Sequence, residues 1–347
     1  MKLCKFGTNR VIEPQGVLPQ AARKIDNSME IHPNEILIDV ISLNIDSASF
    51  SQLKGEAGGD ADKIGKKIME IVAEHGKMQN PVTGSGGMLI GTVAAVGADL
   101  QAGEQRSPLQ VGDKIATLVS LSLTPLKIDE IKEIHMNIDR VDVKAQAILF
   151  ETGIYAKLPD DMTEALALAA LDVAGAPAQT AKLVKPGDSV LVLGASGKSG
   201  MMCCYEAMKR VGPTGNVVAM CRKAEDRDKI LENGFAHEVI LSDVTNALDV
   251  LEKALAANNG REFDLSINCV NIDNSEMASI LPVRDGGTVY FFSMAVSFTK
   301  AALGAEGVGK DVNMIIGNGY TRDHAEITLH QLRESPALCK IFEERYV

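Results

Sequence analysis

The pattern of apolar positions changes near residue 160 and divides the sequence into two parts. Before this point, runs rich in β-branched residues at 35–43 and 88–97 predict strands. After it, short apolar runs alternate with segments of good helix formers up to the last residue. We therefore predict a β-rich domain over residues 1–157 and an α/β domain over residues 158–347.

The β-rich part is expected to hold further strands, one helix and two loops. Residues 61–75 place apolar side chains at i, i+3 and i+4 and predict an amphipathic helix. Glycine, proline and asparagine dominate residues 55–60 and 79–87, which predicts loops. The remaining strands are expected after a turn within residues 111–119, at 145–150 and at 154–159.

The second part alternates helices with strands. Alanine-rich helices are predicted at 164–174 and 178–184, strands at 217–221, 238–241, 263–269, 288–292 and 312–316, and two short helices from residue 323 onward. Such alternation predicts a parallel sheet with right-handed crossovers. In a doubly wound sheet of this kind, the ligand lies at the carboxyl ends of the strands.

A glycine-rich turn follows the apolar run at residues 189–193. Its glycines stand at G-x-x-G-x-x-G spacing, and the turn comprises Gly194, Ala195, Ser196, Gly197, Lys198, Ser199 and Gly200. Glycines let the backbone approach a pyrophosphate, and the N–H groups at the start of the following helix bind its charge. Glycine-rich turns are also common in α/β proteins without this function. Strand–helix alternation on both sides favours a dinucleotide site.

Composition narrows the class of protein. The 347 residues are 46% apolar with no tryptophan, which is typical of a globular protein with an aliphatic core. The net charge of −11 argues against a nucleic-acid partner. No apolar run is long enough to span a membrane, and the first residues do not resemble a signal peptide. Six scattered cysteines are typical of reduced thiols in a cytoplasm.

The order of these landmarks resembles the medium-chain dehydrogenase/reductase superfamily. A β-rich part with a V-G-D turn at 111–113 precedes L-P-D at 158–160, K-P-G-D at 185–188 and the glycine turn. Residues 147–155, 194–200, 292–295 and 317–321 resemble, more narrowly, the L-erythro-3,5-diaminohexanoate dehydrogenase family. The resemblance implies a GroES-like first domain and a Rossmann second domain. It also implies oxidative deamination of a diamino acid in lysine fermentation, with a nicotinamide cofactor.

Two departures from the superfamily pattern stand out. Its members usually continue beyond the last strand and return to the first domain, whereas this sequence ends at Val347. We expect the cleft to be closed differently, for instance by the partner subunit of a homodimer or higher homo-oligomer. The superfamily's zinc enzymes also carry a cysteine and a Gly-His-Glu where this sequence has residues 44–46 and 86–88. We therefore expect no zinc and no other metal.

The expected cofactor is NADP or NAD, with NADP favoured. NAD sites usually have an acid at the end of the second strand, where this sequence has Cys221, Arg222 and Lys223. The two cations offer charge-assisted donors to a 2′-phosphate. Alternatively, they flank a surface helix, and Glu225 or Asp226 binds the ribose.

The catalytic candidates are Asp46, Asn44, Ser47 and Glu151. The first three lie where the resemblance places the active-site loop of the first domain, and Glu151 follows an apolar strand. A carboxylate could bind the substrate's amines or accept the proton that an ammonium must lose before hydride transfer. Asp46 could equally cap its own loop.

Further cofactor contacts are expected at the strand ends. Asn268, Cys269, Ser293 and Met294 end or follow predicted strands. Lys198 is expected either to reach a phosphate or to be an exposed lysine at a helix start. Two other functions remain open: an NADPH-dependent quinone or enoyl reductase, and a dinucleotide-binding protein without catalysis.

Overall fold

The computed structural model describes residues 3–100, 109–317 and 319–347, without the side chains of Ser47 and Ala48. The chain forms two compact units, Met1–Asp160 and Asp161–Val347. They are described separately below. No helix within the described ranges is long and apolar enough to cross a membrane.

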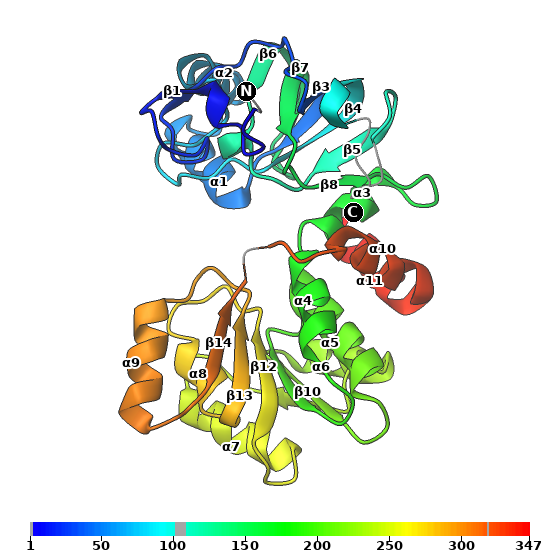
Figure 1. The fold of residues 1–347 in the computed structure, drawn as a ribbon. Helices are drawn as coiled ribbons and strands as arrows, with labels where there is room; N and C mark the ends of the chain where they lie inside the picture. Colours follow the sequence, from blue (N-terminus) through cyan, green and yellow to red (C-terminus); the bar gives the residue numbers. More distant parts are fainter. Residues whose placement is uncertain (1–2, 101–108, 318) are drawn as a thin grey trace. The chain divides into compact units, whose positions relative to one another are not determined.

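Unit 1 is built on a six-stranded antiparallel sheet (Figure 1). The strands run in the order β6-β7-β3-β4-β5-β8, and β1 and β2 form a small separate sheet. Their bounds are β1 Val11–Glu13, β2 Lys24–Ile25, β3 Glu35–Asn44, β4 Met88–Val96, β5 Lys114–Thr117, β6 Leu126–His135, β7 Arg140–Phe150 and β8 Tyr155–Lys157. The helices are α1 Ser47–Glu56 and α2 Ala61–His75.

Helix α2 has the bounds that the apolar spacing predicts. It begins after Asp60, whose carboxylate accepts a hydrogen bond from the Lys63 N–H, and it ends at Gly76 with a left-handed φ of 75°. Its buried residues include Ile64 and Ile68, which pack into the core of unit 1. Strands β1, β2 and β6 and helix α1 were not predicted, and α1 includes the first residues of the expected loop at 55–60.

Unit 2 is a doubly wound parallel sheet. The strands run in the order β11-β10-β9-β12-β13-β14, and every pair is parallel. Their bounds are β9 Ser189–Leu193, β10 Asn216–Cys221, β11 Glu238–Leu241, β12 Phe263–Asn268, β13 Val283–Phe291 and β14 Asn313–Ile316. The helices are α3 Glu164–Leu171, α4 Gly175–Leu183, α5 Lys198–Val211, α6 Ala224–Glu232, α7 Ala247–Ala257, α8 Glu276–Ile280, α9 Phe298–Val308, α10 His324–Glu334 and α11 Pro336–Tyr346.

Strand β9 lies in the middle of this sheet and is buried on both faces. Val190 and Val192 pack in the apolar cluster that includes side chains of α5, α10 and α11. Leu191 and Leu193 point the other way, into the cluster with side chains of α7 and α8. A continuous apolar run is what a parallel strand covered on both faces requires. The α/β fold with one antiparallel and one parallel sheet is the fold predicted from the sequence.

Candidate functional site

The glycine turn requires glycine at two positions for steric reasons. Gly194 follows β9 with a φ of 80°, and a Cβ there would lie 2.9 Å from the Val270 side chain. A Cβ on Gly200 would lie 2.2 Å from the carbonyl oxygen of Gly194. The strand and the helix therefore approach so closely that only glycine fits at these positions. This close approach is what a dinucleotide-binding turn needs.

Helix α5 begins directly after this turn. Its N-cap is Gly197, which has no side chain to bind the first N–H groups of the helix. The side chain of Lys198 at the helix start is held by Asp172, with Nζ 2.5 Å from Oδ2. The same Nζ lies 5.7 Å from the centre of the Tyr346 ring. Ala195 is fully buried, and its N–H donates to the carbonyl of Met220.

A hollow of about 380 Å³ opens at the carboxyl ends of the strands in unit 2. Its lining comes from four segments and consists of Ser199, Cys269, Asn271, Phe292, Ser293, Met294, Gly317 and Gly319. Four predicted cofactor residues, Ser199, Cys269, Ser293 and Met294, are among them. The Met294 side chain is 79% exposed, which leaves its apolar surface available to a ligand.

Asn268 is not part of this lining, because its side chain points into the protein interior. It is fully buried, and its amide nitrogen donates to Ser275 Oγ and Ser279 Oγ, each at 2.9 Å. Its Oδ1 accepts from the Val270 N–H at 2.9 Å. Asn268 therefore holds the backbone that follows β12, next to Cys269, in one conformation.

Cys203 lies behind the hollow, and its Sγ is 3.9 Å from Cys269 Sγ. Burial raises the pKa of the Cys203 thiol well above its usual value, and burial does the same to the pKa of Cys204. Both thiols stay protonated at neutral pH and act as small apolar side chains. Both cysteines therefore pack in the core that includes α5.

Strand β10 ends next to two cations and one paired acid. Arg222 and Lys223 are exposed, and within the described ranges neither side chain makes a hydrogen bond or salt bridge. Asp226, in the first turn of α6, pairs with Arg345 at 3.5 Å. Arg345 also donates to the carbonyl of Ser196 at 3.1 Å. Local sequence patterns did not indicate Arg345, because it lies far along the chain from the turn.

In unit 1, the residues 44–46 and the backbone of Gly87 are in contact. A Cβ on Gly87 would lie 2.0 Å from the Asn44 carbonyl oxygen and 2.8 Å from the Asp46 nitrogen. Asp46 is the N-cap of α1, and its Oδ1 accepts from the Ser49 N–H at 3.0 Å. Capping, the alternative considered for Asp46, is therefore real, but it uses only one carboxylate oxygen.

Two acceptor atoms in this segment have no partner among the residues that the structure describes. Asp46 Oδ2 and Asn44 Oδ1 are both buried and accept no hydrogen bond there. An unpaired buried acceptor is costly, so such atoms are typical of positions that meet a ligand. Both atoms are acceptors, and the ligand that suits them is a hydrogen-bond donor.

The other two catalytic candidates are less well defined. Ser47 begins α1, but its side chain lies outside the described part of the chain. Glu151 follows β7 and is partly buried, and its Oε2 accepts from the Asn34 amide at 3.5 Å. The partial burial of Glu151 and its hydrogen bond from Asn34 do not give this carboxylate a chemical role.

One group of three potential metal ligands exists among the described residues: Glu133, His135 and Asp142, at the end of the β6–β7 hairpin. Asp142 is already engaged there. It bonds His135 Nε2 at 2.9 Å and Arg140 Nε at 2.7 Å, so a guanidinium holds the place where a cation would bind. Neither Asn44 nor Asp46 lies in such a group.

Comparison with known proteins gives consistent matches. Residues 9–159 match the family model described as the L-erythro-3,5-diaminohexanoate dehydrogenase N-terminal domain. The chain is 69% identical to the L-erythro-3,5-diaminohexanoate dehydrogenase of Acetoanaerobium sticklandii over 347 residues, which is 100% of both chains. It is 63% identical to that of Fusobacterium nucleatum subsp. nucleatum over 346 residues, 100% of this chain and 99% of the relative.

A solved structure shows the same fold at low sequence identity. The structure of mycobacterial Rv1454c complexed with NADPH has a TM-score of 0.51 and 18% identity. The match covers 95% of this chain and 86% of that chain.

Proposed function

Since the chain belongs to the L-erythro-3,5-diaminohexanoate dehydrogenase family and is an oxidoreductase, we propose that it oxidises L-erythro-3,5-diaminohexanoate with a nicotinamide dinucleotide. The hydride leaves C3 for the nicotinamide, and the C3 amine becomes an imine. Water then hydrolyses the imine to 5-amino-3-oxohexanoate and ammonia. The family resemblance inferred from the sequence is confirmed by these relatives.

The unpaired acceptors of Asn44 and Asp46 carry the assignment of the substrate site. The substrate bears two ammonium groups, and an ammonium has only donors. Asp46 Oδ2 and Asn44 Oδ1 offer buried acceptors, and Asp46 adds a negative charge. A quinone or an alkene would leave both acceptors without a donor, so these substrates suit the segment less well.

Asp46 is also the group that we propose takes part in proton transfer. An ammonium cannot lose hydride from its carbon until it has lost a proton, so a nearby base has to accept one. The same carboxylate, once protonated, can return the proton as the imine is hydrolysed. Asn44 binds and orients the amine.

Unit 2 is proposed to bind the dinucleotide. The pyrophosphate lies at the start of α5, where the helix offers N–H groups, and the nicotinamide end lies in the hollow lined by Cys269, Ser293 and Met294. The nicotinamide supplies the hydride acceptor. The unpaired Arg222 and Lys223 favour NADP over NAD, because both are available to a 2′-phosphate.

We further propose that the reaction needs no zinc. The positions of the expected ligands hold Asn44 and Asp46 on one segment and glycines on the other. One carboxylate and one amide do not make the Cys/His/Glu set that a catalytic zinc requires.

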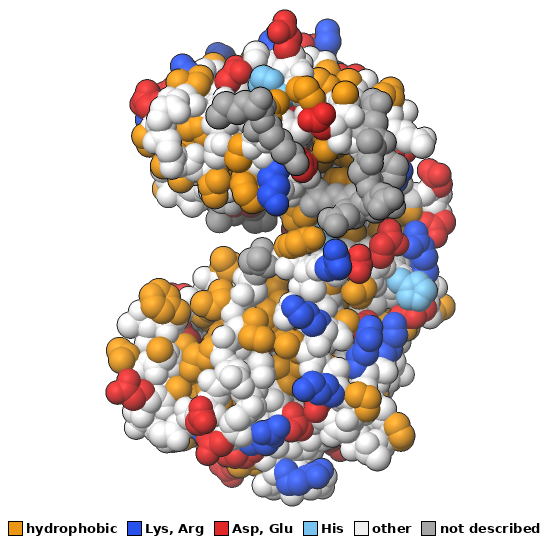
Figure 2. Space-filling model, viewed as in Figure 1, with side chains coloured by type: hydrophobic (Ala, Val, Ile, Leu, Met, Phe, Trp, Pro, Cys, Tyr) orange, Lys and Arg blue, Asp and Glu red, His pale blue; other side chains and the backbone are white. Residues whose placement is uncertain are grey.

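We also propose a cytoplasmic homo-oligomer. The six cysteines are all free thiols, which is typical of a reducing compartment. On α9, Phe298, Leu303 and Val308 are exposed, and Figure 2 shows separate hydrophobic side chains at the surface of unit 2. A symmetric homodimer is the commonest assembly of soluble proteins. Light scattering of the purified protein would measure the subunit number.

The test of the function is a spectrophotometric assay. L-erythro-3,5-diaminohexanoate is mixed with NADP or NAD, and the reduced-nicotinamide absorbance and ammonia are followed together. We expect equal amounts of reduced cofactor and ammonia. Cofactor binding without reduction would contradict the assignment and leave the fold intact.

A further inference from the structure

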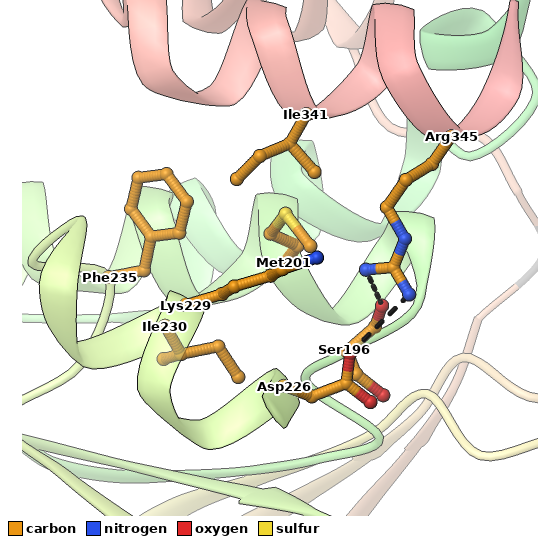
Figure 3. Close-up of a pocket in the computed structure, with 8 residues that line it drawn as sticks. All are labelled: Ser196, Met201, Asp226, Lys229, Ile230, Phe235, Ile341 and Arg345. Carbon is orange, nitrogen blue, oxygen red and sulfur yellow. Dashed lines mark hydrogen bonds and ion pairs between the residues drawn. The ribbon is translucent and has the colours of Figure 1, made fainter. Parts of the chain in front are cut away.

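Arg345, in the last turn of α11, connects this helix to two parts of the dinucleotide site (Figure 3). One guanidinium nitrogen donates to the Ser196 carbonyl in the glycine turn, and the other pairs with Asp226 in the first turn of α6. The Asp226 side chain is only 16% exposed, and that of Arg345 is 33% exposed. These contacts join three segments that are far apart in the sequence.

A second residue of the same helix turn reaches the other side of the glycine turn. The Tyr346 ring packs against Lys198 Nζ and, edge-on, against the Phe342 ring at 5.1 Å. Burial raises the pKa of the Tyr346 hydroxyl, so the ring stays neutral. Residues 345 and 346 therefore contact both Ser196 and Lys198, the two residues that flank Gly197.

The contact with Ser196 bears on how the turn presents its N–H groups. Because a peptide unit is planar, fixing the Ser196 carbonyl also fixes the Gly197 N–H, which donates to the Gly194 carbonyl at 3.2 Å. Helix α5 starts at the next residue. The direction of this peptide therefore helps to set where the first N–H groups of α5 point.

The surroundings of Arg345 are built around apolar side chains. Ile341 comes from the same helix, Met201 from α5, and Ile230 from α6, and they line a nearly filled pocket beside the guanidinium (Figure 3). These apolar contacts keep α11 close to the turn, and Arg345 supplies the polar contact at their edge. The Arg345 side chain is thus held in one position by its polar and apolar contacts.

We propose that Arg345 is a positioning residue of the dinucleotide site, holding the glycine turn in the shape that binds the cofactor's pyrophosphate. This inference rests on the proposed nicotinamide cofactor. It assigns to α11 a part in cofactor affinity that its distance from the glycine motif in the sequence does not suggest. The role concerns binding, so the hydride step itself should be unaffected.

The test compares Arg345→Ala with Arg345→Lys and with a matched control, Arg333→Ala. Arg333 is also an arginine of the last two helices and makes an ion pair, with Asp161 at 2.8 Å, but it does not touch the glycine turn. For each variant, the Kd of the reduced cofactor is measured by its fluorescence, KM and kcat by absorbance, and Tm by thermal unfolding.

We expect Arg345→Ala to raise the cofactor's Kd and KM about tenfold and to leave kcat within about twofold, as loss of uniform binding does. Arg345→Lys keeps a donor and the charge, and should recover part of the affinity. Arg333→Ala should lower Tm about as much as Arg345→Ala does, with no change in Kd.

Two results would overturn the inference: an unchanged cofactor Kd in Arg345→Ala, or an equal rise in Kd in Arg333→Ala. Measurements on the wild-type protein distinguish failure of this inference from failure of the proposed function. If it binds cofactor but does not oxidise the diamine, the proposed reaction fails, and the Kd comparison still decides the role of Arg345. If it binds no dinucleotide, both proposals fail.

Discussion

Replacing Asp46 with asparagine separates the capping role that the structure shows from the substrate-binding role that we propose. Asparagine is as good an N-cap as aspartate, so its side-chain oxygen can still accept the Ser49 N–H bond. The negative charge is lost, and the Oδ2 acceptor becomes an NH₂ donor. The fold should survive, while the substrate's ammonium would meet a donor where we propose that it meets a carboxylate oxygen.

The expected loss follows from the kind of bond that is removed. A hydrogen bond to a charged group contributes about 1.5–3 kcal/mol, which corresponds to a fall in kcat/KM of roughly 10- to 150-fold. If Asp46 is also the base, the loss of general base catalysis adds a factor of about 10²–10⁴, seen mainly in kcat. A fall confined to KM would assign binding alone to Asp46.

Asp60→Asn is the matched control for this experiment. Asp60 caps α2 in the same way, with Oδ1 3.2 Å from the Lys63 N–H, and it is exposed. Both variants should unfold within about 1 kcal/mol of the wild type, measured by urea unfolding. Asp60→Asn should keep full kcat/KM. If Asp46→Asn also keeps it within about threefold, Asp46 is only a cap and our reasoning about the unpaired oxygen is refuted.

Three other predictions concern the cofactor, the metal and stability. Arg222→Ala should raise KM for NADP by about five- to tenfold and leave KM for NAD unchanged, in initial-rate assays; an equal change for both cofactors would exclude a 2′-phosphate contact. Dialysis against a zinc chelator should leave kcat within about twofold, and activity that is lost and then restored by Zn²⁺ would contradict the zinc-free proposal. Arg10→Met should lower the free energy of unfolding, measured in urea, by about 3–5 kcal/mol. The buried carboxylate of Glu35 would lose the Arg10 guanidinium, whose nitrogens lie 2.8 and 2.7 Å from its two oxygens. A loss below about 1 kcal/mol would show that Glu35 finds another partner.

The sequence predicts well those elements whose burial follows a regular period. Helix α2 places Ile64, Ile68 and Ile71 on one face, and β9 is apolar from Val190 to Leu193, so both were located from the pattern alone. Strand β6 was not predicted, because its apolar residues do not alternate with a regular period of two. Its register with β7 shifts between Ile128 and Glu130 and again between Ile131 and Glu133. Its place in the sheet comes from pairing with β7, which is a long-range contact.

Helix α1 shows a second limit. Among the side chains of this helix that the structure describes, only Phe50 and Leu53 are fully buried and apolar, too few for a recognisable helical period. Asp46 specifies the start of α1 as its N-cap. From the sequence, capping by Asp46 was expected for a loop and not for a helix. The same residue is thus both the start signal for a helix and the leading catalytic candidate.

The strand-end rule located part of the hollow in unit 2, because it depends only on sheet topology. Cys269, Ser293 and Met294 lie at the lining, since residues directly after parallel strands share one edge of the sheet; their contact with a cofactor stays a prediction. The rule could not distinguish Asn268 from Cys269, because neighbouring residues at a strand end point to opposite sides. The inward side chain of Asn268 is fixed by Ser275 and Ser279, whose positions depend on how the following segment folds back.

The ion pair of Asp226 bears on which dinucleotide the chain prefers. The sequence left two interpretations of the end of β10, one with the cations Arg222 and Lys223 and one with an acid such as Asp226. The structure gives Asp226 a cation of its own, Arg345, and leaves the other two without a salt bridge among the described residues. An acid that is already paired accepts less readily from a ribose hydroxyl, because its charge is partly neutralised. Arg345 therefore contacts both features: it donates to the Ser196 carbonyl, and it pairs with the carboxylate that we propose would otherwise favour NAD. If this is correct, Arg345→Ala should weaken binding of NADP more than binding of NAD, since it releases Asp226 at the same time as it loosens the turn.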